Sequence, residues 1–311
     1  MKRTILLTLV SIVLSMSSDH SAQELLVDHF VWPISASDQP DYPLNSTFGP
    51  RQKLSENGRY DFHRGIDIHV PMETVVYAIA DGEIFRAGDY PHYSDRIVVI
   101  RHEIDGQRYH TYYAHLHSVM VKEGDLVKRG QPVALSGKSE SGFPHLHMEI
   151  RRGSNYQKNA LHPLAFLDYP DHGGPDVTIE SLDRSDPENT SAQVYVELPL
   201  DQLDLVRVEI ILMSAADDRE IARHTFDMEA WNQEFDRKSL DQASFNGVVV
   251  DPARFNRKSE TYRIDFDFNQ LNTSDFEDDI KAKAIATDAR GNQTTTHFPA
   301  VEKAEPAREP Q

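Results

Sequence analysis

The chain has 311 residues, a formal net charge of −18, no cysteine and a hydrophobic fraction of 39%. A length in this range corresponds to about two domains of roughly 150 residues each. The acidic balance disfavours nucleic acid as a partner, because a negative surface repels phosphate backbones. The lack of cysteine excludes disulfides, cysteine nucleophiles and thiolate metal sites, so a tightly bound metal would need nitrogen and oxygen ligands.

Residues 1–22 are predicted to be a secretory signal peptide. A basic Lys2-Arg3 pair is followed by an apolar run over residues 4–16 and then by small residues up to Ala22. The apolar run is 13 residues long, whereas a membrane span requires about 20. An uncleaved N-terminal anchor is the alternative, and Ser17 is a competing cleavage site. We therefore expect an exported chain with no transmembrane span after signal cleavage.

The next region is predicted to be an antiparallel β domain. Residues 23–40 form a lead-in with no periodic pattern. Over residues 41–170, short runs of β-branched and aromatic residues alternate with Gly-containing turns, which is typical of hairpins. Arg96–Arg101, followed by the turn Asp105-Gly106, is one example. No stretch of about 12 residues in this region shows helical periodicity.

The remainder of the chain is predicted to be a second β domain. Residues 171–176 have the composition of a linker. Strand-like segments then recur between polar stretches, and they are Ala192–Glu197, Leu205–Met213, Tyr262–Phe268, Lys281–Thr287 and Thr294–Phe298. This pattern predicts a β-sandwich of immunoglobulin-like character over residues 177–300. Met228–Phe235 is either a short helix or a loop, and the charged tail, 301–311, is expected to be disordered.

The second half is expected to fold separately and to carry no chemistry. Residues 173–311 include 29 acidic and 15 basic residues, a balance of −14, while the rest of the chain has 21 and 17, a balance of −4. The only histidines of this half are His224 and His297, too few and too scattered for a metal site. It would serve as a solvated acidic surface or as a docking site for a protein partner.

Residues with metal chemistry gather in three clusters of the first half. The clusters are His63-Arg64-Gly65-Ile66-Asp67, Tyr113-Ala114-His115-Leu116-His117 and Pro144-His145-Leu146-His147. Neutral imidazole and carboxylate are the ligands that hold Zn²⁺ with one position open for water. In both His-x-His pairs the imidazoles would share one face of a strand, because side chains alternate along it.

His63 and Asp67 are four residues apart, which is informative about the local backbone. A helix would place them on one face, but Gly65 and Pro71 argue against a helix. A straight strand would separate them by about 13 Å, too far for ligands of one metal. A shared metal therefore requires a bend, which Gly65 would permit. The alternative is a hydrogen-bonded pair that fixes a loop.

These motifs, in this order, resemble the lysostaphin/LytM-type family of zinc endopeptidases that cleave peptidoglycan peptides. The resemblance covers roughly Asp41 to Leu167. It includes Thr47-Phe48-Gly49-Pro50-Arg51 near its start and Met148-Glu149-Ile150 after the last histidine pair. Met72-Glu73-Thr74 replaces a common Gly-Thr-Pro, and Tyr90-Pro91-His92-Tyr93 enlarges a turn. These two departures leave the substrate preference open.

The resemblance implies a peptidase domain over residues 41–170 that binds one zinc per chain. It implies that the zinc ligands are His63, Asp67 and His147. It also implies that His115 and His145 are catalytic and act on a zinc-activated water and on the developing oxyanion. His69 and His117 lie outside the family's ligand set, so we expect no role for them in the site.

The implied function is zinc-dependent hydrolysis of peptide cross-links in peptidoglycan, in the periplasm or at the cell wall. One alternative is a non-catalytic regulator of a cell-wall amidase, because some members of the family have lost ligands. All five site residues are present here, which argues against that alternative. The other alternative is a zinc peptidase that acts on protein substrates.

Overall fold

The computed structural model describes residues 29–35, 44–53, 59–90, 96–139, 142–170, 173–183, 190–199, 203–234, 244–245, 248–251, 259–268 and 279–298. The predicted signal peptide, most of the predicted lead-in and the predicted disordered tail lie outside these residues. A search of the described part of the chain found no helix with the length and apolar character needed to cross a membrane.

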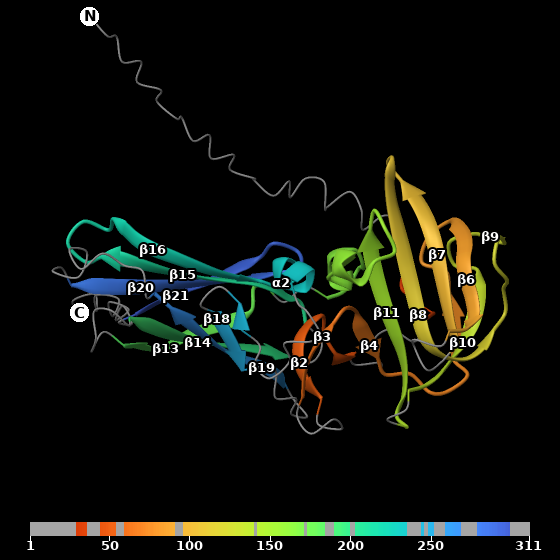
Figure 1. Ribbon diagram of the computed structural model, residues 1–311, viewed down its shortest axis with the longest axis horizontal. Helices are drawn as coiled ribbons and strands as arrows, with labels where there is room; N and C mark the ends of the chain where they lie inside the picture. The colour runs from red at the N-terminus through yellow and green to blue at the C-terminus, as the bar shows by residue number, and fades with distance from the viewer. Residues whose placement is uncertain are drawn as a thin grey trace, which may run out of the picture.

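The prediction of an all-β chain with antiparallel sheets is confirmed (Figure 1). The first half is built on a ten-stranded sheet with the order β1-β4-β11-β10-β8-β7-β6-β9, in which β5 pairs with β10, β12 pairs with β11, and β11 also pairs with β8. The strands are β1 (Leu44–Ser46), β4 (Ile66–Ile68), β5 (Val75–Tyr77), β6 (Gly82–Asp89), β7 (Arg96–Ile104), β8 (Gln107–Val119), β9 (Leu126–Val127), β10 (Pro132–Lys138), β11 (Pro144–Arg152) and β12 (Ala160–Leu161). A separate hairpin is formed by β2 (Gly49–Lys53) and β3 (Arg59–His63). Two 3₁₀ turns, Gln157–Asn159 and Pro163–Ala165, flank β12.

The alternation of side chains along β11 determines which residues reach each face of the sheet. Leu146, Met148 and Ile150 are fully buried in the main hydrophobic core. His147 and Glu149, which lie between them in sequence, are on the opposite face. The chemistry-bearing residues of β11 therefore share one face, while the apolar residues that anchor the strand share the other.

The second half consists of two antiparallel sheets (Figure 1). The five-stranded sheet has the order β13 (Asp176–Asp183), β14 (Ser191–Pro199), β19 (Ser259–Asp267), β18 (Val248–Asp251) and β17 (Ser244–Phe245). The four-stranded sheet has the order β16 (Glu220–Asp227), β15 (Leu205–Ser214), β20 (Ile280–Asp288) and β21 (Gln293–Phe298). Of the two structures considered for Met228–Phe235, the helix is found, as α2 (Met228–Glu234). The immunoglobulin-like character of this half remains a prediction.

The two halves pack directly against each other, with α2 lying between them in Figure 1. One continuous cluster of buried hydrophobic residues has members from both halves. The hydroxyl of Tyr169 donates a hydrogen bond of 2.6 Å to Oδ2 of Asp204. The guanidinium of Arg290 lies 4.4 Å from the centre of the Tyr169 ring. The domain boundary at residues 171–176 remains a prediction, but the residues just before it are held by the second half.

Candidate metal centre

Three side chains from different strands of the first half converge on one point. Nε2 of His63, at the end of β3, lies 3.2 Å from Oδ1 of Asp67 in β4 and 3.0 Å from Nδ1 of His147 in β11. The third side of this triangle, from His147 Nδ1 to Asp67 Oδ1, is 2.9 Å. Donors around a tetrahedral zinc are about 3.3 Å apart when each bond is about 2.05 Å long. The buried His-Asp-His triangle therefore fits a zinc ion.

The predicted bend between His63 and Asp67 is present, at the break between β3 and β4. Gly65 lies at this bend, as predicted, and the structure gives a second reason for a glycine there. Its φ angle is not in the left-handed region that favours glycine. A Cβ atom at Gly65 would instead lie 2.1 Å from the carbonyl oxygen of Met148 in β11. The glycine is needed because the two backbones approach closely, which brings β4 against the strand that carries His147.

Hydrogen bonds on the far side of each imidazole fix its tautomer. Nδ1 of His63 is 2.7 Å from the carbonyl oxygen of Thr47, so it carries the proton and leaves a lone pair on Nε2. Nε2 of His147 is 3.1 Å from Oε1 of Glu149, so it donates to that carboxylate. Nδ1 of His147 faces Oδ1 of Asp67 and Nε2 of His63, and a metal ion at the centre would displace its proton and use its lone pair. Outer partners of this kind orient metal-binding histidines.

The electrostatics of the triangle favour a cation at its centre. Burial alone would raise the pKa of Asp67, but His63 and His147 outweigh it and hold that pKa well below its usual value. Burial, assisted by Arg51, lowers the pKa of His63 to about 4. Burial also opposes protonation of His147, but its hydrogen bonds to Asp67 and Glu149 raise its pKa to about 9. The ionised carboxylate of Asp67 thus faces the neutral imidazole of His63, which offers a lone pair, and the imidazole of His147, which binds a cation such as a proton tightly.

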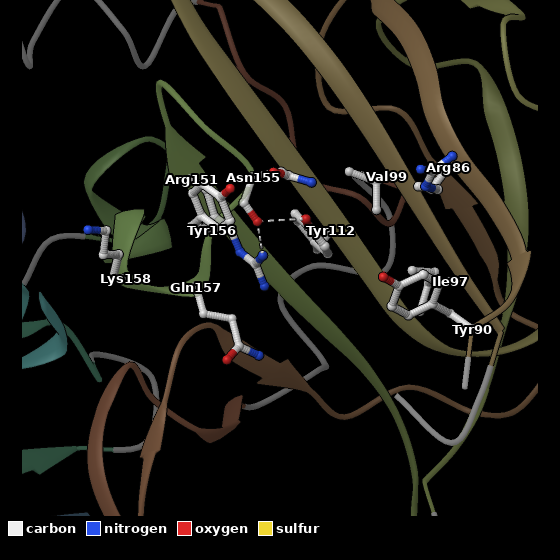
Figure 2. Close-up of a pocket in the computed structure, with 10 residues that line it drawn as sticks. All are labelled: Arg86, Tyr90, Ile97, Val99, Tyr112, Arg151, Asn155, Tyr156, Gln157 and Lys158. Atoms are coloured by element: carbon white, nitrogen blue, oxygen red, sulfur yellow. Dashed lines mark hydrogen bonds between the residues drawn. The ribbon is translucent and has the colours of Figure 1, made fainter. Parts of the chain in front are cut away.

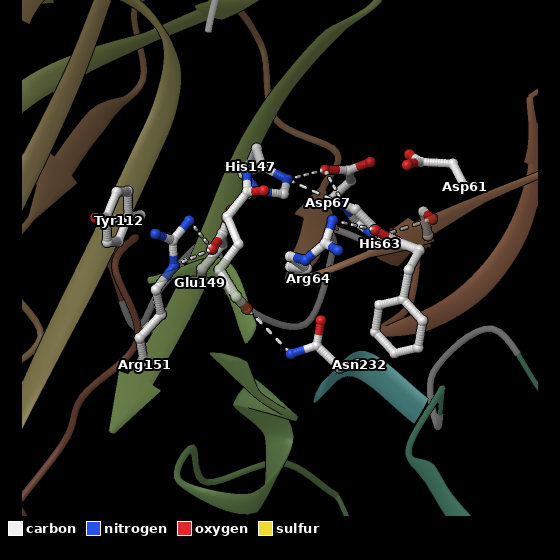
Figure 3. Close-up of polar contacts among 12 residues, drawn as sticks. Asp61, His63, Arg64, Asp67, Tyr112, His147, Glu149, Arg151 and Asn232 are labelled. Atoms are coloured by element: carbon white, nitrogen blue, oxygen red, sulfur yellow. Dashed lines mark hydrogen bonds and ion pairs between the residues drawn. The ribbon is translucent and has the colours of Figure 1, made fainter. Parts of the chain in front are cut away.

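A buried ion pair supports the triangle, and sequence reasoning missed its role (Figure 3). Nε of Arg151 donates a hydrogen bond of 2.6 Å to Oε2 of Glu149, whose other oxygen faces His147. The guanidinium lies 3.6 Å from the centre of the Tyr112 ring, and the Arg151 side chain is only 2% exposed. Burial would raise the pKa of Glu149, but Arg151 and His147 lower it to about 2. The spacing His147-x-Glu149-x-Arg151 on a predicted strand was the available signal.

Arg51 is a second supporting residue whose role was missed. Its guanidinium donates to Oδ2 of Asp67 over 3.2 Å, which leaves Oδ1 directed at the imidazoles. Arg51 lies on β2, whose pairing with β3 places Gly49 opposite His63. The sequence motif that contains Arg51 was recognised, but no spacing rule connects it to Asp67.

His115 and His145 lie beside the triangle, so the structure brings together all five predicted site residues. The ring centres of His115 and His145 are 4.8 Å apart, and His115 is 5.8 Å from the ring centre of His147. Nε2 of His145 is 3.9 Å from Oδ1 of Asp67. His115 has a φ of 59°, at a position where the register between β7 and β8 shifts. Such an irregularity re-aims a side chain out of the regular alternation.

The two histidines expected to have no role lie elsewhere. His69 is exposed, and its Nδ1 is 3.3 Å from the amide of Asn45. His117 is exposed as well, and its Nε2 is 3.6 Å from Glu73. Among the described residues, neither belongs to the group of side chains that could hold a metal ion.

A cavity of about 760 Å³ lies farther along the sheet (Figure 2). Its lining residues are Arg86, Tyr90, Ile97, Val99, Tyr112, Arg151, Asn155, Tyr156, Gln157 and Lys158. The register places Tyr112 opposite Glu149, so the floor of the cavity shares a sheet face with the metal triangle. Three of these residues are basic and none is acidic, in a chain with a net charge of −18.

Fold and site together define an antiparallel β domain with a candidate metal centre of two histidines and one aspartate. Residues 61–161 match the model of Peptidase family M23, so the first half carries a domain of this family. This confirms the resemblance found in the sequence.

Similar proteins include peptidoglycan hydrolases and an activator. Peptidoglycan DD-endopeptidase ShyB of Vibrio cholerae is 38% identical over 108 residues, which are 34% of this chain and 24% of that protein. Murein hydrolase activator NlpD of Salmonella typhimurium is 33% identical over 136 residues, which are 43% of this chain and 32% of that protein. The catalytic domain of lysostaphin from Staphylococcus simulans is 30% identical, with 43% of this chain and 97% of that chain covered and a TM-score of 0.38. The chain thus spans only about a quarter to a third of the length of these two curated relatives.

Proposed function

We propose that this protein is an exported zinc endopeptidase that hydrolyses peptide cross-links of peptidoglycan. His63, Asp67 and His147 are the zinc ligands, and His115 and His145 are the catalytic residues. The observation that carries this proposal is the buried donor triangle, with sides of 2.9–3.2 Å. The relatives named DD-endopeptidases support the substrate class and a periplasmic or cell-wall location.

The side chains around the triangle have distinct tasks in this mechanism. A bound zinc would lower the pKa of a water toward neutrality and polarise a peptide carbonyl. His145 donates its Nδ1 proton to the carbonyl of Phe143 over 2.9 Å, so Nε2 is available to accept a proton near Asp67. His115 is adjacent, and it would donate a hydrogen bond to the oxyanion that develops on the substrate. The proton held at Nε2 of His145 would then pass to the leaving amine.

The cavity beyond the triangle offers room for the rest of the peptide. Arg151, on its floor, is four residues from His147 on the same strand, which corresponds to about 13 Å at about 3.3 Å per residue. An extended substrate peptide would cover that distance with about four residues. Lys158 at the cavity suits a carboxylate of a peptidoglycan stem peptide, whereas Arg86 is already paired with Glu123 over 3.2 Å.

The alternative of a non-catalytic activator is supported by the relatives named NlpD. The complete set of ligands and of flanking imidazoles favours the enzyme. A zinc peptidase that acts on proteins would use the same centre and differ only in substrate.

A digest of purified peptidoglycan, with mass analysis of the released fragments, tests the proposal. The zinc-loaded protein is expected to release peptides cut within cross-links, and Asp67→Ala is expected to release none. An activator would release nothing alone but would stimulate a cell-wall amidase added to the same digest. Cleavage of casein without cleavage of peptidoglycan would favour the third candidate.

A further inference from the structure

The segment Thr47–Gly49 lies between the metal triangle and the second half of the chain. On one side, the carbonyl of Thr47 accepts the Nδ1 proton of His63 over 2.7 Å. On the other side, the hydroxyl of Thr47 donates a hydrogen bond to the carbonyl of Leu203, which belongs to the second half. Thr47 and Leu203 are both buried, with 3% and 0% exposure. Two hydrogen bonds thus connect a candidate metal ligand to the second half through one residue.

His162 is a further member of this hydrogen-bonded group and contacts the hydroxyl of Thr47. Its Nδ1 accepts from the backbone N–H of Leu164 over 3.3 Å, so its proton is on Nε2. Nε2 is 3.3 Å from the hydroxyl oxygen of Thr47 and also hydrogen-bonds the backbone of Leu203. His162, Thr47 and Leu203 thus form one buried hydrogen-bonded group beside the metal triangle.

The neighbouring residues are packed just as closely against the second half. Gly49 has a φ of +135°, and a Cβ atom there would lie 2.8 Å from Sδ of Met228 and 3.6 Å from the hydroxyl of Tyr262. Both of these residues belong to the second half and are almost fully buried. Phe48 packs against Phe62 of the first half, with ring centres 5.2 Å apart. The segment that carries the Thr47 carbonyl is thus held on both sides.

From this arrangement we propose that the second half is a brace for the metal centre and that Thr47 is its positioning residue. By holding Thr47, the second half places the carbonyl that fixes the tautomer and the orientation of His63. This role rests on the proposed zinc site. It assigns a task to a region that lies outside the residues matched by the family model.

Substitutions of Thr47 in the full-length chain test the brace. Thr47→Val removes the hydroxyl at nearly constant volume, and Thr47→Ser keeps it. Partners outside the ligand shell contribute about 10- to 100-fold in metal affinity, so we expect Thr47→Val to weaken zinc binding by about tenfold and Thr47→Ser to restore it. Zinc affinity is measured by competition with a chromophoric chelator. Side-chain ¹⁵N shifts of His63 in the metal-free protein are expected to show loss of the Nδ1–H tautomer in Thr47→Val alone.

A second pair of variants separates bracing from general stability. Met228→Ala removes the side chain that packs on Gly49. Leu212→Ala opens a similar cavity in β15, far from the contact with Thr47. Leu212 is seven residues, or about 23 Å, along the strand from Leu205, which lies two residues after Leu203. We expect Met228→Ala to weaken zinc binding several-fold and Leu212→Ala to leave it unchanged. If zinc affinity is unchanged in both Thr47→Val and Met228→Ala, the proposal of a brace is overturned. If Thr47→Val does not fold, unchanged zinc affinity in Met228→Ala is enough to overturn it. A wild-type protein that binds no zinc overturns the proposed function instead.

Discussion

Replacement of Glu149 should separate support of the metal from stability of the fold. Glu149→Gln removes the negative charge between His147 and Arg151. Because Arg151 is only 2% exposed, its cation stays buried without the carboxylate that neutralises it, although the carbonyl of Asn155 and the ring of Tyr112 remain in contact with it. Loss of one member of a buried ion pair destabilises a protein by about 3–5 kcal/mol. The lost carboxylate–histidine hydrogen bond should also weaken zinc binding by about 10- to 100-fold.

The double variant Glu149→Leu/Arg151→Met provides the matched control. Replacing a whole buried ion pair with apolar side chains of similar volume is often neutral or stabilising. The double variant should therefore recover the free energy of unfolding but keep the weakened zinc affinity. Urea unfolding of the metal-free protein gives the first quantity, and chelator competition gives the second. Wild-type zinc affinity in either variant would refute the role of Glu149 in orienting His147 for the metal. If Glu149→Gln alone is as stable as the wild type, the expected cost of breaking the buried ion pair is refuted.

Three further predictions concern catalysis, pH and the second half. His115→Ala and His145→Ala should keep zinc but lose about 10²- to 10⁴-fold in turnover, and near-normal turnover of either variant would show that its catalytic role is wrong. His102 and His162 are buried, and burial lowers their pKa values to about 4 and about 3. Below about pH 6.5 the unfolded chain takes up protons on these histidines and the folded protein does not, so the free energy of unfolding falls as the pH falls. The slope is about 1.4 kcal/mol per pH unit for each histidine, which gives a loss of about 4 kcal/mol for both at pH 5. Urea unfolding of the wild type and of His102→Gln at pH 7.5 and pH 5 isolates the share of His102, because other titrating groups such as His63 and His147 are present in both proteins. The loss between the two pH values should be about 2 kcal/mol smaller in His102→Gln. A fragment ending at residue 172 should still bind zinc, but less tightly than the full chain, and equal affinity would show that the second half does not brace the centre.

The site could be predicted from the sequence wherever its geometry is local. The spacing of His145 and His147 places both on one strand face in any register, because strand side chains alternate. The four-residue separation of His63 and Asp67 required a bend, which the structure contains. The ordered motifs supplied the remaining assignments through family resemblance.

The supporting residues could not be predicted because their partners are set by long-range packing. Arg51 reaches Asp67 only through the separate β2–β3 hairpin, and Thr47 meets Leu203 across 156 residues of sequence. The close approach of Gly65 to the backbone of Met148 could not be predicted for the same reason, because Met148 belongs to a distant strand. The second half was expected to fold separately, and sequence patterns contain no signal for its contacts with the metal domain.

Metal analysis of protein purified without chelator tests the zinc centre most directly. The wild-type chain is expected to contain one zinc, and Asp67→Ala is expected to contain none, because the triangle loses its only anion. His69→Ala serves as the control and should retain one zinc. A zinc content near zero in the wild-type protein, with no uptake when zinc is added, would contradict the proposed metallopeptidase.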